Sequence, residues 1–72
     1  MAALPRISGA DAERALRGAG FVRVSQKGSH VKLRNDAGRT VINPMHPELA
    51  SGTLRSIIRQ AGLTVDEFTA LL

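Results

Sequence analysis

The chain opens with a segment in which apolar residues recur at helical spacing. The segment runs from Ser8 to Ala19, and its apolar positions fall three or four residues apart, which predicts an amphipathic helix. These positions are Ala12, Ala15, Leu16 and Ala19. Ser8 with Asp11 three residues later has the pattern of a capping box, and Gly20 ends the helix. Because the apolar stripe is mostly alanine, it buries little area, so we expect this helix to lie on a broader element.

The next part of the chain shows the two-residue alternation of β-strands. Residues 21–26 and 30–34 both alternate, and the tight connection Gly28-Ser29 between them predicts a hairpin. A turn rich in Asn, Asp and Gly follows. Residues 40–42 then form a short third strand, which Pro44 ends.

The alternation also predicts which face of the sheet each side chain occupies. Apolar side chains of the first two strands should share one face, under the helices. They are Val22, Val24, Val31 and Leu33. The opposite face should meet solvent and carry Arg23, Ser25, His30, Lys32 and Arg34.

A loop and two further helices complete the chain. Two prolines within residues 43–50 exclude a continuous helix there. A second helix follows, with apolar residues at helical spacing and Gly62 as its end. Its apolar residues are Leu54, Ile57, Ile58 and Ala61, with Arg55 and Arg59 on the opposite side. Thr64 with Glu67 forms another capping-box pattern and starts a short closing helix.

Together these elements predict one α+β domain over residues 1–72. The order is α-β-β-β-α with a short C-terminal helix, and the three strands form an antiparallel sheet. Both longer helices are expected on one face of that sheet, which leaves the other face exposed to solvent.

Composition narrows the classes of function. With 72 residues and no cysteine, the chain has no disulfide scaffold and no thiol chemistry. No apolar run approaches the length of a membrane span, and the segment MAALPRISGADAER lacks the charged start and apolar middle of a signal peptide. We therefore expect a cytoplasmic protein with no membrane partner.

Charge is the more informative property. Ten Lys and Arg residues against six Asp and Glu give a net charge of +4. Seven of the basic residues lie between Arg14 and Arg39, where Asp36 is the one acid. This basic segment suggests a polyanionic partner, although an excess of surface Lys and Arg can also serve solubility alone.

His30 is the residue with the clearest chemical potential. It follows Gly28-Ser29 at the start of a strand and shares a predicted face with basic residues, so a phosphodiester held there would lie within reach of its imidazole. In RNA the 2′-hydroxyl can attack the adjacent phosphorus without a metal ion, and a general acid/base accelerates that step about 10²- to 10⁴-fold. The predicted RNA-binding residues are Arg23, Lys27, Lys32 and Arg34. The alternative is that His30 is a polar strand residue facing water.

A second proton-transfer group is left open by the sequence. His46, in the loop Pro44-Met45-His46-Pro47, could serve as acid/base partner or could fix the loop. The other candidate auxiliary residues are Lys27, Ser29 and Lys32. The acidic residues are concentrated at predicted helix starts, where they complement the helix dipole, and we expect no metal and no other cofactor.

Four motifs follow one another along the chain. They are Gly20-Phe21 before the first strand, Gly28-Ser29-His30, Pro44-Met45-His46, and Gly52-Thr53-Leu54-Arg55. In this order and spacing the motifs resemble the HicA-type toxin family, small bacterial mRNA interferases of type II toxin–antitoxin pairs. The similarity covers about residues 8–68.

The resemblance implies a double-stranded-RNA-binding-domain-like fold and a metal-independent ribonuclease activity against mRNA. It implies that His30 is the catalytic histidine and that a HicB-type antitoxin covers it, with DNA contacted only indirectly through the antitoxin. Without Tyr or Trp, the chain is poorly equipped to stack on bases, so we expect binding through phosphates and low sequence specificity. Two alternatives stay open: a non-catalytic double-stranded-RNA-binding module of the same fold, and a protein whose basic surface only docks an acidic antitoxin.

Overall fold

The computed structural model describes residues 3–72 and has the order of elements that the sequence predicts. Met1 and Ala2 lie outside the described residues. They belong to the expected domain and begin the segment that was compared with a signal peptide. The helices are α1 (Gly9–Gly18), α2 (Ser51–Ala61) and α3 (Val65–Ala70). The strands are β1 (Val22–Lys27), β2 (His30–Arg34) and β3 (Thr40–Pro44).

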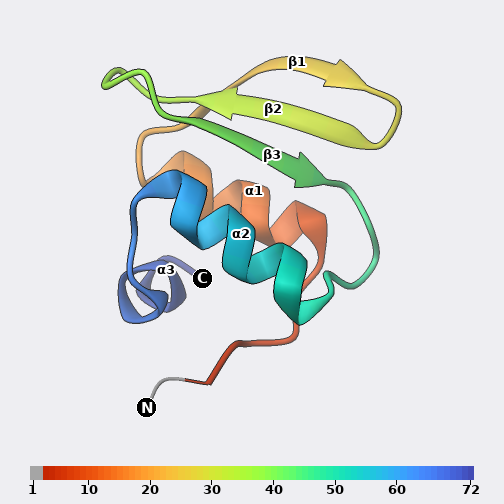
Figure 1. Cartoon of the computed structure of the whole chain (residues 1–72), viewed down its shortest axis with the longest axis vertical. Coiled ribbons are helices and arrows are strands. Elements are labelled where there is room, and N and C mark those ends of the chain that lie inside the picture. The colour runs from red at the N-terminus through yellow and green to blue at the C-terminus, as the bar shows by residue number, and fades with distance from the viewer. Residues whose placement is uncertain (1–2) are drawn as a thin grey trace.

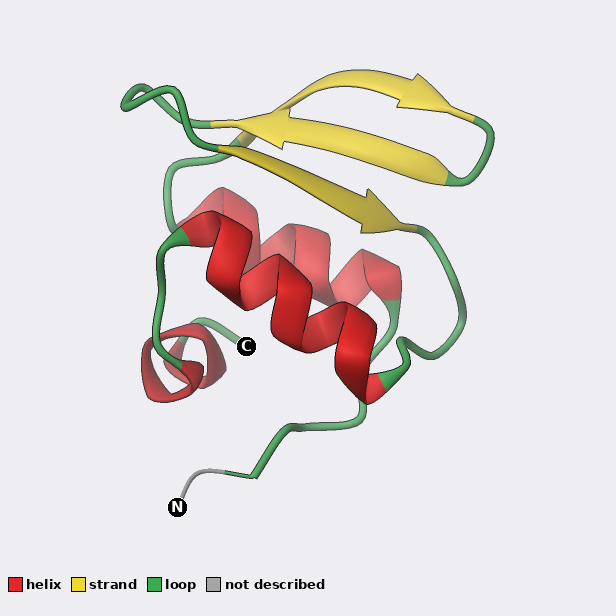
Figure 2. Ribbon diagram, in the orientation of Figure 1, coloured by secondary structure: helices red, strands yellow, loops and turns green. Residues whose placement is uncertain are grey.

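The three strands form one antiparallel sheet in the order β1-β2-β3. Helices α1 and α2 both lie on the same side of this sheet, and α3 packs against these two helices on the side away from the strands (Figures 1 and 2). This is the α-β-β-β-α architecture of double-stranded-RNA-binding-like domains, which confirms the predicted fold class. The outer face of the sheet carries no helix in the part of the chain that is described.

Local signals in the sequence set the helix ends. The Ser8 hydroxyl accepts a hydrogen bond from the Asp11 amide at 3.0 Å, and the Asp11 carboxylate accepts one from the Ser8 amide at 3.2 Å, so the predicted capping box is confirmed. The Thr64 and Glu67 pair does the same for α3. Gly62 ends α2 in the left-handed conformation with φ 75°. None of the helices within residues 3–72 has the length and apolar character of a membrane span.

The hydrophobic core fills the space between the helices and the inner face of the sheet. The sheet contributes Val31 and Leu33 from β2 and Val41 from β3, all fully buried. Helices and loops contribute Ala12, Ala15, Leu16, Phe21, Leu49, Leu54, Ile57, Ile58, Ala61 and Phe68. The predicted core positions of both longer helices and of β2 are therefore confirmed.

The predicted core positions of β1 are wrong. Val22 and Val24 are 57% and 47% exposed. The strand pairing shows why: Arg23 lies opposite Leu33, but Ser25 lies opposite Lys32, so Val24 is an extra residue in β1, a β-bulge. A one-residue shift reverses the face of every preceding side chain. Val22 therefore points to the outer face, whereas Arg23 points toward the helices.

The bulge exchanges two valines for a larger buried side chain. Phe21, two residues before Arg23 and on the same side, is only 2% exposed. An aromatic side chain buries more area than one valine, so burial of Phe21 offsets part of the stabilisation that the exposed Val22 and Val24 would have given. It also brings the guanidinium of Arg23 to Glu13 on α1, a nearly buried carboxylate.

Candidate active site

The turn between β1 and β2 determines where His30 lies. Only two residues, Gly28 and Ser29, connect the strands, and Gly28 has φ 59°, a left-handed conformation that favours glycine. His30 is thus the first residue of β2, with Lys27 as its strand partner on one side and Pro44 on the other. The His30 side chain is exposed, so its imidazole is accessible to a ligand at the outer face.

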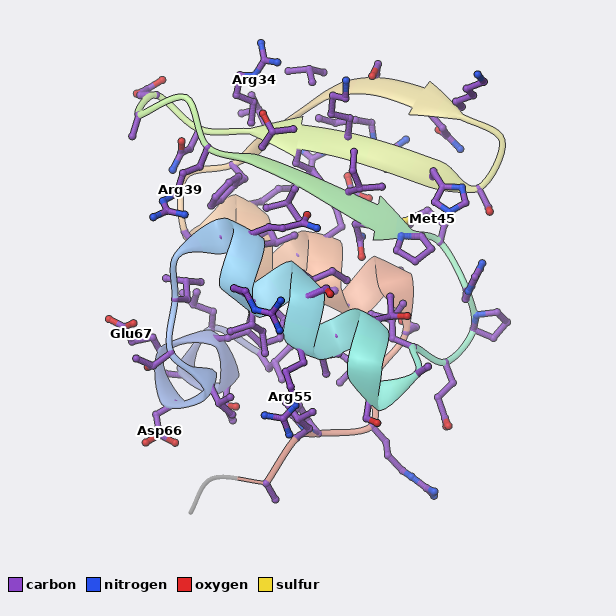
Figure 3. All side chains as sticks on the ribbon, viewed as in Figure 1. Arg34, Arg39, Met45, Arg55, Asp66 and Glu67 are labelled. Atoms are coloured by element: carbon purple, nitrogen blue, oxygen red, sulfur yellow. The ribbon has the colours of Figure 1, made fainter. Side chains whose placement is uncertain are left out.

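Three of the four predicted RNA-binding residues share this outer face with His30. Lys32 and Arg34 follow it at two-residue intervals along β2, and Lys27 is its cross-strand partner. Figure 3 shows Arg34 projecting from the sheet on the side away from the helices. By contrast Arg55, also labelled there, lies beyond α2 on the far side of the molecule. The outer face therefore holds a row of cations ending at an imidazole.

The fourth predicted residue, Arg23, is not part of this row. Its Nη2 lies 2.6 Å from Oε1 of Glu13 and its Nε lies 3.1 Å from Oε2, a bidentate ion pair on the inner side of β1. Arg17 also donates to Glu13, at 2.9 Å from Nη2. The hydrogen bond from Arg23, followed by that from Arg17, holds the pKa of Glu13 below its usual value, and the same bond raises the pKa of Arg23. The bulge explains the failed prediction, because a regular strand would have placed Arg23 outward.

His46 lies beside His30, a proximity that the sequence left open. The two ring centroids are 6.5 Å apart, with an interplanar angle of 70°. The antiparallel pairing of β2 and β3 brings the end of β3 to the start of β2, since Pro44 is opposite His30. The loop after Pro44 therefore begins at the edge of the His30 site, and both imidazoles are exposed there.

Backbone hydrogen bonds hold this loop in place. The Met45 amide donates to the Ser29 carbonyl at 2.7 Å, and the Gly9 amide donates to the His46 carbonyl at 2.9 Å. Gly9 also contacts β3 so closely that a Cβ at this position would lie 2.1 Å from the Pro44 carbonyl oxygen. No sequence pattern predicts this contact between the start of α1 and the His46 loop. Of the candidate auxiliary residues, Ser29 thus has a structural role, because its backbone carbonyl holds the His46 loop.

Two acidic residues of α1 have structural partners. Asp11 caps α1 and Glu13 pairs with two arginines, as described above. The backbone hydrogen bond with Ser8 is the main reason that the pKa of Asp11 is lowered. Within residues 3–72, no group of three or more His, Cys, Asp or Glu side chains is arranged to hold a metal ion.

The surface around His30 is open. Two hollows elsewhere on the molecule are lined by residues at the ends of the chain and helices, and neither includes His30 or His46. An exposed sheet face with a row of cations suits a long polyanion better than a small molecule enclosed in a cavity.

Comparison with protein-family models identifies a family that this chain resembles. A family model described as the HicA toxin of bacterial toxin–antitoxin systems matches residues 9–63. This range spans α1, the whole sheet, the His46 loop and α2. No curated protein sequence matches the chain significantly.

Proposed function

The chain belongs to the HicA toxin family of bacterial toxin–antitoxin systems, and from this premise we propose that it is a metal-independent endoribonuclease that cleaves mRNA with His30 as general acid/base. The observation that carries the proposal is the position of His30. It is exposed at the start of β2, beside Lys27 and on the same face as Lys32. A phosphodiester bound by these cations lies next to an imidazole, a group that can accept or donate a proton in the reaction.

RNA supplies the nucleophile for this reaction. Removal of the 2′-hydroxyl proton lets O2′ attack the adjacent phosphorus, the bond between phosphorus and O5′ breaks, and O5′ gains a proton. The products are a 2′,3′-cyclic phosphate and a 5′-hydroxyl end. Lys27, Lys32 and Arg34 offset the negative charge that grows on the phosphoryl oxygens. DNA, without a 2′-hydroxyl, is not a substrate of this chemistry.

The experiment compares wild type with His30→Ala on a single-stranded RNA in EDTA. We expect cleavage by the wild type and a loss of about 10²- to 10⁴-fold in His30→Ala. Arg55→Ala, which removes a cation from the far side of α2, is the control and should cleave like the wild type. Circular dichroism and thermal unfolding establish that all three proteins are folded. Equal cleavage by wild type and His30→Ala would refute the role of His30.

The same comparison separates the alternative function. A non-catalytic RNA-binding module of this fold would bind RNA but leave it uncut in both proteins. Growth arrest on induced expression gives a second readout, since the wild type should arrest growth and His30→Ala should not.

Membership of the family implies a HicB-type antitoxin as the partner in the pair. We propose that this antitoxin covers the outer face of the sheet and with it His30. That face exposes the apolar side chains of Val22, Val24 and Ile42 among its cations, with exposed fractions of 57%, 47% and 39%. Apolar side chains bordered by charges are typical of protein interfaces, whereas RNA phosphates would use the cations alone. Since mRNA is the substrate, we place both proteins in the cytoplasm.

A further inference from the structure

We propose that His46 is a second catalytic residue of the same site, which protonates the leaving 5′-oxygen while His30 accepts the 2′-hydroxyl proton. This inference rests on the proposed ribonuclease function and extends it to a residue outside the Gly28-Ser29-His30 motif. The observation behind it is the spacing of 6.5 Å between the two ring centroids.

The chemistry requires two proton transfers on opposite sides of one phosphorus. The attacking and leaving oxygens of a phosphoryl transfer lie roughly in line, so the base and the acid must approach from different directions with the phosphate between them. Each nitrogen must come within about 2.6–3.2 Å of its oxygen. Both residues are exposed, and with ring centroids 6.5 Å apart the two imidazoles can reach different oxygens of one phosphodiester bound across them. Their 70° interplanar angle points the two rings in different directions.

The assignment of roles follows from the neighbouring charges. Lys27 is the cross-strand partner of His30, and Lys32 lies on the same face of β2. Besides the charge on the phosphoryl oxygens, these cations stabilise the negative charge that develops on O2′ as its proton is removed, so we assign the 2′-hydroxyl to the His30 side. His46, in the loop beyond β3, is then the residue that protonates the leaving oxygen.

The protein holds the two histidines at this spacing through its backbone. The hydrogen bond from the Met45 amide to the Ser29 carbonyl, at 2.7 Å, joins the residues that directly precede His46 and His30. The His46 carbonyl accepts from the Gly9 amide at 2.9 Å, which ties the loop to the start of α1. Catalytic pairs need such fixed spacing, because a displacement of about 1 Å can reduce the rate about 100-fold.

The contacts that fix the loop come from backbone groups. His46 and Met45 are held through their backbone carbonyl and amide, and residue His46 itself is exposed. Its ring lies 6.5 Å from the ring of His30, centroid to centroid. The imidazole of His46 is therefore accessible to a ligand bound at His30.

A substrate with a sulfur leaving group tests the assignment. The probe is an oligonucleotide with a single ribonucleotide, whose bridging 5′-oxygen is replaced by sulfur in one version. A thiolate leaves without protonation, so the variant that lacks the general acid should be rescued by this substrate and the variant that lacks the base should not. All assays contain EDTA, and His46→Gln accompanies His46→Ala in case the alanine variant does not fold.

We expect His46→Ala or His46→Gln to cleave the oxygen substrate about 10²- to 10⁴-fold more slowly than the wild type and the sulfur substrate within about tenfold of it. His30→Ala should be slow on both. Wild-type cleavage of the oxygen substrate by the His46 variants, or an equal loss on both substrates, would overturn the role of His46 and leave that of His30 intact. Wild-type cleavage by His30→Ala would instead overturn the proposed function itself.

Discussion

Arg23 of β1 and Glu13 of α1 form a bidentate ion pair across the inner side of the sheet, with Nη2 2.6 Å from Oε1 and Nε 3.1 Å from Oε2. Arg17 completes the cluster from the same helix as Glu13. Only 8% of the Glu13 side chain is exposed, so its carboxylate depends on these arginines for the hydrogen bonds that water would otherwise provide. Arg23, which the strand alternation predicts to bind RNA, therefore holds the first strand to the first helix.

Replacement of Arg23 should affect stability more than RNA binding. In Arg23→Ala the Glu13 carboxylate keeps Arg17 as its only partner of the cluster, and we expect the free energy of unfolding to fall by about 1–3 kcal/mol. Arg23→Lys should lose a smaller part of the unfolding free energy, because an ammonium group keeps the charge but cannot donate in the bidentate geometry. Urea denaturation measures the loss, and RNA binding is measured below the onset of unfolding. An unchanged unfolding free energy together with weaker RNA binding would mean that Arg23 contacts RNA and does not stabilise the fold.

The same ion pair predicts how stability depends on pH. The pKa of Glu13 is lowered in the folded protein from its ordinary value of 4.5, chiefly by the hydrogen bond from Arg23. A carboxyl group with a lowered pKa contributes its stabilisation above the ordinary value, and this contribution is lost as the pH falls through the folded-state pKa.

We therefore expect wild type to lose unfolding free energy between pH 5 and about pH 3 more steeply than Glu13→Gln. The variant is less stable at neutral pH, but it has no carboxylate at this position to protonate. Urea denaturation of both proteins across this range is the measurement. Parallel curves would show that the pair does not contribute to acid sensitivity.

The close contact between Gly9 and β3 should make this position intolerant of any side chain. A Cβ would lie 2.1 Å from the Pro44 carbonyl oxygen and 2.8 Å from the Met45 Cα, and these are backbone atoms that cannot simply rotate away. In Gly9→Ala we expect a loss of about 1–3 kcal/mol in stability. We also expect slower RNA cleavage, because the displaced loop carries His46.

Gly52 provides the matched control for this substitution. It lies in α2 and a Cβ there would meet no atom within 4 Å among the described residues. Gly52→Ala should leave cleavage unchanged and raise stability by up to about 1 kcal/mol, since alanine is the better helix former. Thermal unfolding and cleavage assays on both variants test the contact. Equal behaviour of the two variants would contradict it.

Much of the fold follows from short-range signals. The helix ends are set by Ser8 with Asp11, by Gly62 and by Thr64 with Glu67, and each of these acts within a few residues of the chain. The hairpin at Gly28 is equally local. Such signals can be recognised in the sequence because they do not depend on what packs against them.

The features that the sequence did not predict depend on distant parts of the chain. The bulge at Val24 is favourable because Arg23 pairs with Glu13 and Phe21 packs into the core. The alternation along β1 indicates neither of these contacts. The approach of His46 to His30 likewise depends on the register between β2 and β3 and on Gly9. Residue types identified the two histidines as candidates, but only the tertiary fold brings them together.

The exposed valines predict how the antitoxin binds. Val22 is 57% exposed on the outer face, so Val22→Ser should change stability by less than about 1 kcal/mol. If the antitoxin covers this face, its affinity should fall about tenfold, equivalent to about 1.4 kcal/mol. Leu72→Ser, at an exposed apolar residue beyond α3, is the control. Calorimetric titration with the antitoxin measures both, and equal affinities would place the interface elsewhere.

The row of cations on the outer face predicts the salt dependence of RNA binding. If Lys27, Lys32 and Arg34 each contact a phosphate, each releases a counterion when RNA binds, and the logarithm of the binding constant falls linearly with the logarithm of salt concentration. Removal of one contact should reduce that slope by about 0.7 for a single strand. The measurement uses His30→Ala as the background, so that the RNA stays intact during titration.

In this background Lys32→Ala and Arg34→Ala should both lower the slope and weaken binding to RNAs of different sequence by similar factors, because phosphate contacts do not distinguish bases. Arg55→Ala removes the same charge from the far side of α2 and should leave the slope unchanged, since that side chain lies beyond the helices from the sheet. A loss of slope in Arg55→Ala equal to that in Lys32→Ala would mean that net charge, and not this face of the sheet, determines RNA binding.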